Sequence, residues 1–86
     1  MKLPKKQIVG LSQAAILLRH MEKIGGITKL QALNYYGIMN TGARIGELRQ
    51  LLYHNCIHKN IEICTIMFEV PSGKRVAKYF IKKGEL

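Results

Sequence analysis

The sequence predicts a mainly α-helical α+β domain, in which three short helices are followed by a β-hairpin. Apolar residues recur at helical spacing between residues 12 and 52, and they alternate with polar residues between residues 61 and 82. Within the alternating part, Pro71-Ser72-Gly73-Lys74 is a turn signal. The 86 residues make one small domain, which we divide into a basic N-terminal arm over residues 1–10 and a single folded domain over residues 11–86.

The first predicted helix begins after Ser12 and runs to about Ile24. Ser12 is a favourable N-cap, and the Gly25-Gly26 pair ends the helix. Because His20 lies one position before the end of the apolar stripe, we expect it at the surface. The stripe follows the spacing of a core-facing helix and consists of Ala14, Leu17, Leu18 and Met21.

The stretch from Thr28 to Leu52 is predicted to form two helices joined by a tight turn. Thr28 and Gln31 have the spacing of a capping box, in which each side chain satisfies a backbone N–H of the other residue. Gly37 can adopt the left-handed conformation that closes a helix. We therefore expect Ile38 to place its side chain between the two helices.

The second of these helices, predicted from Asn40 to Leu52 with Asn40 or Thr41 as its N-cap, has two different faces. Gly42 and Gly46 each cost about 1 kcal/mol in a helix interior. Either the helix approaches a partner's backbone closely there, or Gly46 lets another helix pack nearby. The apolar stripe consists of Ile45, Leu48 and Leu52. The opposite side is small and polar, with Asn40, Ala43, Gly46, Glu47 and Gln50 on it and Arg44 and Arg49 near its margins.

From Cys56 to Val70 the residues become β-branched and aromatic, which predicts the first strand of a hairpin. The returning strand follows the turn and extends to Lys82. The apolar positions change parity between Ile63 and Cys64, and this change predicts a bulge or bend. The hairpin tip is basic because Lys74 and Arg75 follow its turn.

The charge balance is the strongest global signal. The chain has 14 Lys and Arg against 5 Asp and Glu, a formal charge of +9 and a pI near 9.9. Folding does not require such an imbalance, so it indicates an anionic partner, either a nucleic acid or an anionic membrane surface. The alternative is a merely basic, solvated surface.

We expect a mature cytoplasmic protein. No apolar run approaches the roughly 18 residues of a membrane span. The N-terminus superficially resembles a signal peptide, but Gln7, Ser12 and Gln13 interrupt its apolar patch. Cys56 and Cys64 fit reduced thiols better than a disulfide framework.

The sequence predicts neither catalysis nor a cofactor. It contains no Asp, its five Glu are scattered, and no phosphate-binding loop is present. A zinc set is possible by ligand type alone in His54, Cys56, His58 and Cys64. Its spacing matches no common zinc module, and buried thiols with surface histidines are the alternative, so we predict no metal.

Three helices followed by a basic hairpin is the order of a winged helix-turn-helix domain. The sequence also resembles a family of small helix-turn-helix proteins found mainly in bacteriophages and prophages. Members show G-x-I-T-x-x-x-A-L, a turn around G-I, then A-R-I-x-x-L-R and finally G-K-R-V-A-x-Y. The resemblance covers Leu11 to Ile81 and rests on Gly26, Ile27, Thr28, Ala32, Leu33, Gly37, Ile38, Ala43, Arg44, Ile45, Leu48, Arg49, Gly73, Lys74, Arg75, Val76, Ala77 and Tyr79. One departure is the segment after Leu52, which lacks the family's glycine-containing turn.

The resemblance implies that the helix over residues 40–52 enters the major groove of double-stranded DNA. Asn40 would then pair with adenine, Thr41 would meet a base or a phosphate, and Arg44 would reach guanine or the backbone. Arg49 and Gln50 lie further along, nearer to phosphate or the groove edge.

Three further cations are implied contacts outside that helix. Lys29, at the start of the preceding helix, has a phosphate within reach, while Lys74 and Arg75 would enter an adjacent minor groove. For the arginines, the alternative is ordinary surface pairing with Glu47 or Glu22.

The leading hypothesis is therefore a small phage-type DNA-binding protein, acting as a transcriptional regulator or as an accessory architectural factor. Its footprint is small, so tight binding would need a homodimer or cooperative neighbours. The alternative is an adaptor or inhibitor that binds a host protein and does not read DNA. No membrane is expected as a partner.

Overall fold

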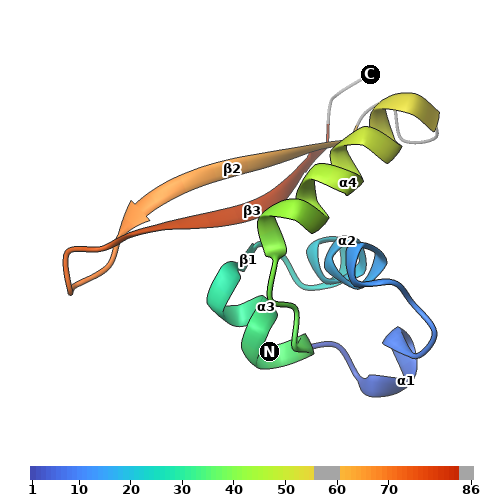
Figure 1. The fold of residues 1–86 in the computed structure, drawn as a ribbon, viewed down its shortest axis with the longest axis horizontal. Helices are drawn as coiled ribbons and strands as arrows, with labels where there is room; N and C mark the ends of the chain where they lie inside the picture. The colour runs from blue at the N-terminus through green and yellow to red at the C-terminus, as the bar shows by residue number, and fades with distance from the viewer. Residues whose placement is uncertain (56–60, 84–86) are drawn as a thin grey trace.

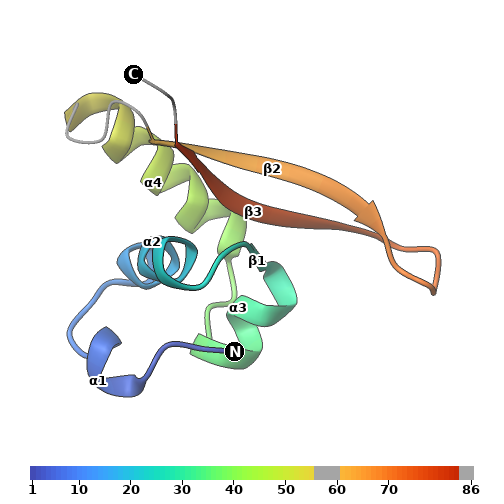
Figure 2. The same cartoon turned by 180° about the vertical axis from the view of Figure 1, so that it is seen from behind.

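The computed structural model describes residues 1–55 and 61–83, in which helices pack against one side of a small antiparallel sheet at one of its ends (Figures 1 and 2). This arrangement confirms the mainly helical α+β class. The hairpin of β2 and β3 extends beyond the helices in both views. The elements are α1 (Lys5–Ile8), α2 (Gln13–Lys23), β1 (Ile27–Thr28), α3 (Lys29–Tyr36), α4 (Thr41–Asn55), β2 (Ile61–Glu69) and β3 (Arg75–Lys83).

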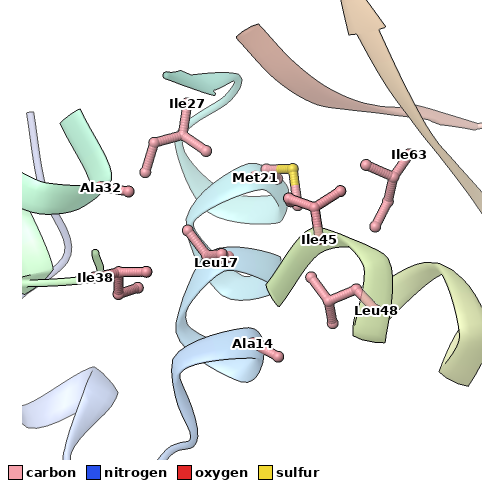
Figure 3. Close-up of a cluster of buried hydrophobic side chains, with 9 residues drawn as sticks. All are labelled: Ala14, Leu17, Met21, Ile27, Ala32, Ile38, Ile45, Leu48 and Ile63. Carbon is pink, nitrogen blue, oxygen red and sulfur yellow. The ribbon is translucent and has the colours of Figure 1, made fainter. Parts of the chain in front are cut away.

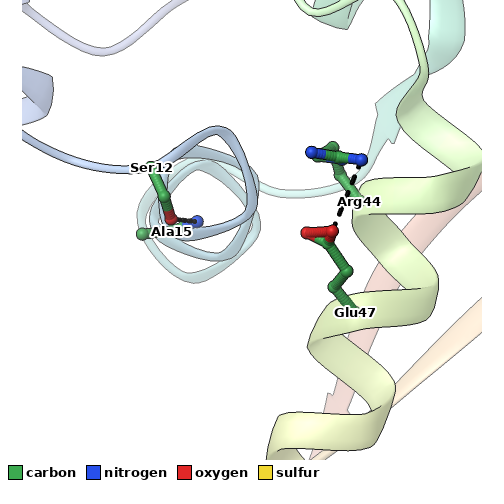
Figure 4. A network of polar contacts seen from close by, with 4 residues as sticks. All are labelled: Ser12, Ala15, Arg44 and Glu47. Atoms are coloured by element: carbon green, nitrogen blue, oxygen red, sulfur yellow. Dashed lines mark hydrogen bonds and ion pairs between the residues drawn. The ribbon is translucent and has the colours of Figure 1, made fainter.

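α2 begins and packs as its sequence predicts, with one exception. The Ser12 hydroxyl accepts a hydrogen bond from the Ala15 N–H at 3.2 Å and caps the helix (Figure 4). The prediction that His20 is a surface residue is wrong, because its side chain is 2% exposed. Its Nδ1 lies within hydrogen-bond distance of the Tyr36 hydroxyl, so α3 covers a residue that local spacing had placed outside.

α3 has the predicted cap at each of its ends. The Thr28 N–H donates to Gln31 Oε1 at 3.0 Å, and the Gln31 N–H donates back to Thr28 Oγ1 at 3.1 Å. Gly37 adopts the left-handed conformation with φ +69°, and the Ile38 N–H donates to the Ala32 carbonyl at 3.2 Å. Ile38 is fully buried, as expected.

The core lies where α2, α4, α3, β1 and the base of β2 meet (Figure 3). Its buried side chains are Ala14, Leu17, Met21, Ile27, Ala32, Ile38, Ile45, Leu48 and Ile63. Because Ile45 and Leu48 of α4 point into this core, the opposite side of α4 is left at the surface.

The sheet has the strand order β1-β3-β2, and both pairings are antiparallel. β2 and β3 pair without interruption from Ile61 opposite Lys83 to Glu69 opposite Arg75. The predicted bulge between Ile63 and Cys64 is therefore wrong. Ile63 is 5% exposed and faces the helices, whereas Cys64 is on the other face of the strand. The apolar residues change faces with no extra residue in the strand.

The N-terminal segment, which the sequence analysis set apart as a basic arm, is docked on the domain. Leu3 is 4% exposed, and its N–H donates to the Tyr36 hydroxyl at 3.0 Å. The Met1 ammonium group donates to the Tyr35 hydroxyl at 3.2 Å. Lys2, Lys5 and Lys6 still face solvent, so the segment adds positive charge without being free to trail.

Candidate nucleic-acid interface

α4 presents a small polar surface, which we call the outer face of α4. It lies opposite the buried stripe, and its most exposed side chains are those of Glu47 and Gln50. The outer face consists of Ala43, Gly46, Glu47 and Gln50. With so little side-chain bulk, the helix backbone can come close to a partner surface there.

The two residues predicted to act at the start of α4 point in different directions. Asn40 is exposed and precedes the helix, and its carbonyl accepts from the Arg44 N–H at 3.2 Å. Thr41 is fully buried, and its hydroxyl has no hydrogen-bond partner among the described residues. Only Asn40 of this pair is therefore presented to a ligand in this conformation.

Arg44 makes an ion pair with Glu47, which is one of the alternatives that the sequence left open. Arg44 Nη2 lies 3.4 Å from Glu47 Oε2, and the two side chains are 34% and 50% exposed. Both extend from α4 toward α2 in Figure 4. Arg44 Nε is buried and has no hydrogen-bond partner in the described part of the chain. The guanidinium thus lies at the margin of the outer face.

Arg49 fastens α4 to the first strand of the hairpin. Its Nε and Nη2 donate to the Ile63 carbonyl at 3.3 and 3.1 Å, and Nη2 also donates to Thr65 Oγ1 at 2.8 Å. Sequence reasoning missed this role because Ile63 lies 14 residues further on and the strand faces were not known. In this conformation the guanidinium is used within the protein.

The remaining predicted cations and Gln50 are all at the surface. Lys29 is the first residue of α3, and Gln50 lies on the outer face of α4. Lys74 and Arg75 are exposed at the far end of the hairpin, which projects beyond the helices (Figure 1). The predicted set therefore divides into an exposed group and a group held by internal contacts.

β3 adds two lysines that the predicted site did not include. Lys78 and Lys82 lie on one face of the hairpin, opposite Ile66 and Glu62 of β2. Lys82 is exposed and Lys78 is half-buried. The even spacing of these lysines along the predicted strand was the available signal. Together with the tip, they make β3 a basic strand.

Neither a metal site nor a membrane-spanning helix is found among the described residues. Among them, no group of three His, Cys, Asp or Glu could hold a metal ion. Cys64 is a half-buried free thiol, whereas the side chains of His54, Cys56 and His58 lie outside the described part. In the same described ranges, no helix is long and apolar enough to cross a membrane.

A capped turn between α3 and α4, packed on α2 and followed by a projecting hairpin, defines a winged helix-turn-helix fold. A family model described as a winged helix-turn-helix domain matches residues 12–84, and the chain belongs to this family. The winged helix-turn-helix fold class predicted from the sequence is thereby confirmed. Comparisons with curated proteins and with solved structures found no match.

Proposed function

We propose that this protein binds double-stranded DNA, with the outer face of α4 in the major groove and the hairpin tip at an adjacent minor groove. The observation that carries the proposal is the combination of a small, polar, exposed helix face with a projecting basic hairpin in a chain of charge +9. A winged helix-turn-helix domain typically uses these two elements for DNA contact, and the charge supplies affinity for phosphate.

The exposed members of the predicted set carry the proposed contacts. Asn40 and Gln50 have amide groups suited to adenine in the major groove. Lys29, Lys74 and Arg75 would contact phosphates or the minor groove edge. Thr41 is buried, and Arg49 is exposed but hydrogen-bonded to β2, so both would support the helix that carries the contacts.

The biological role that we propose is that of a phage-type transcriptional regulator or accessory architectural factor in the bacterial cytoplasm. Such a protein works by occupying DNA and needs no catalytic group. One copy has a small footprint, so pairing or cooperative binding of copies would raise its specificity.

A salt series tests this proposal. The affinity of the protein for a random duplex and for DNA flanking its own gene is measured by fluorescence anisotropy at several salt concentrations. We expect tighter binding to the flanking DNA and a linear fall of log affinity with log salt. Lys74→Ala should make that slope shallower by about one unit.

Lys5→Ala is the matched control because it removes the same charge from α1, which lies far from the hairpin in Figures 1 and 2. It should leave the slope unchanged. Equal slopes for both variants, with no preference for the flanking DNA, would mean that only the bulk charge of the chain attracts DNA.

A second candidate is an adaptor or inhibitor that binds a host protein. It is favoured by the low positive charge of the outer face of α4, since both flanking arginines make internal contacts. Arg44 would reach the DNA backbone if its exposed ion pair with Glu47 opened on binding, so Arg44→Ala distinguishes the two candidates. A folded Arg44→Ala variant with unchanged DNA affinity would support the host-protein candidate.

A further inference from the structure

Among the described side chains on the outer face of α4, the ionised one is a carboxylate. Glu47 is 50% exposed and lies on the side of this face that is nearer to Arg44. Arg49 lies at the other margin, where it is held against β2. The surface that we propose meets DNA therefore carries a negative charge, and both arginines that flank it are held by contacts within the protein.

The ion pair with Arg44 does not use the full acceptor capacity of Glu47. Arg44 Nη2 approaches Oε2 at 3.4 Å, while a carboxylate offers two oxygens with about four acceptor positions. An i,i+3 ion pair that is this exposed is weak, on the order of a few tenths of a kcal/mol. Glu47 can therefore exchange its partner when another donor arrives.

A carboxylate in the major groove discriminates between base pairs. Repulsion by the phosphates weakens binding at every sequence, because the phosphate charge does not depend on sequence. The repulsion is offset where a base supplies a donor. The N4 amino group of cytosine is a major-groove donor that carboxylates accept from.

We infer that Glu47 is a specificity-determining residue, which selects DNA sites with a cytosine against the second turn of α4. On binding, Glu47 accepts a hydrogen bond from the cytosine N4 amino group, and the released guanidinium of Arg44 turns to a phosphate. This inference rests on the proposed DNA binding and names the sequence feature that the helix reads.

The test is selection of binding sites from a randomised duplex library by the wild type and by Glu47→Gln. We expect the wild type to enrich cytosine at one position, and Glu47→Gln to lose that enrichment in favour of adenine. The variant should also bind random duplex more tightly, so that its ratio of specific to random affinity falls about tenfold, a typical value for one base contact.

Two further variants separate charge from position. Glu22→Gln removes the same charge from an exposed position on α2 and should leave the selected sequence unchanged. Glu47→Asp keeps the charge but shortens the side chain, so it should retain weak binding to random duplex and lose the cytosine enrichment. Circular dichroism confirms that each variant is folded.

The outcomes distinguish failure of the cytosine contact from failure of the proposed DNA binding. A wild type that selects a sequence which Glu47→Gln leaves unchanged would overturn the role of Glu47 alone. A wild type that selects no sequence would contradict both the cytosine contact and sequence-specific DNA binding. Equal tightening by Glu47→Gln and Glu22→Gln would likewise reduce Glu47 to one negative charge among five.

Discussion

Arg49 of α4 donates two hydrogen bonds to the carbonyl oxygen of Ile63 in β2, from Nε at 3.3 Å and from Nη2 at 3.1 Å. A third bond from Nη2 to Thr65 Oγ1 completes the contact. Charge-assisted bonds of this kind are stronger than neutral ones. They fix the angle between the helix and the hairpin, which are the two elements proposed to contact DNA.

Arg49→Ala should lower the free energy of unfolding by about 1–2 kcal/mol, because the charged donor to the Ile63 carbonyl is lost. Urea unfolding followed by circular dichroism measures the change. Gln50→Ala on the outer face should stay within about 0.5 kcal/mol of the wild type. Unchanged stability with weakened DNA binding would instead assign Arg49 to the DNA contact.

The same substitution at two glycines should have opposite effects. Gly37→Ala places a Cβ in the left-handed conformation at φ +69° and should destabilise the protein by about 1 kcal/mol. Gly46→Ala has open space at the Cβ within a helix and should stabilise it by about 0.5–1 kcal/mol. Thermal unfolding measures both.

Gly46→Ala also tests why a glycine lies on the outer face of α4. If this face approaches DNA closely, the more stable variant should bind DNA less tightly. Tighter folding with unchanged DNA affinity would show that close approach at this glycine is not required.

His20 should make stability depend on pH. Burial, followed by the positive N-terminus, lowers the pKa of His20 below its ordinary value of 6.5. At acidic pH the unfolded chain then binds more protons than the folded one. The stabilisation that comes from keeping His20 neutral is therefore complete above pH 6.5, and the free energy of unfolding decreases as the pH falls toward the lowered pKa. Urea unfolding at pH 7.5 and pH 5 measures this loss.

His20→Gln removes the titrating group and should reduce the difference in stability between the two pH values. The remaining histidines are common to both proteins, so their contribution cancels in the comparison. The same pH dependence in wild type and variant would contradict a protonation cost at His20.

Gly26 should be sensitive to substitution because the hairpin passes close to it. A Cβ at this position would lie 2.7 Å from Lys78 Cε and 3.2 Å from the Tyr79 carbonyl oxygen. Gly26→Ala should therefore lower the free energy of unfolding by about 1 kcal/mol. The loss should be smaller in a Lys78→Ala background, because the long Lys78 side chain no longer lies against the new Cβ. Thermal unfolding of the four proteins in this cycle measures the coupling, and an equal cost in both backgrounds would contradict it.

Features set by neighbouring residues could be predicted from the sequence. The capping box of Thr28 and Gln31 lies within four consecutive residues, and the left-handed turn at Gly37 needs only a missing Cβ. The helix-turn-helix order follows from these local signals. Contacts between distant segments have no such local sequence signal. An example is the contact of His20 with Tyr36, which lie 16 residues apart.

The candidate site was predictable to the same extent. Lys29, Asn40, Gln50, Lys74 and Arg75 are exposed, as their proposed roles require. Thr41 is buried because it lies at i, i+4 and i+7 spacing with Ile45 and Leu48, so it belongs to the apolar stripe. That spacing was readable in the sequence, whereas the attachment of Arg49 to β2 depended on the strand faces.

The unbroken pairing of β2 and β3 limits the number of residues by which the hairpin can be lengthened. One residue added to each strand would exchange the two faces beyond the insertion, turning Met67 to where Phe68 now points. Two residues added to each strand would preserve both faces and move the tip outward by about 7 Å, close to the rise of two DNA base pairs. The hairpin can therefore be lengthened without exchanging its faces only in steps of two residues per strand.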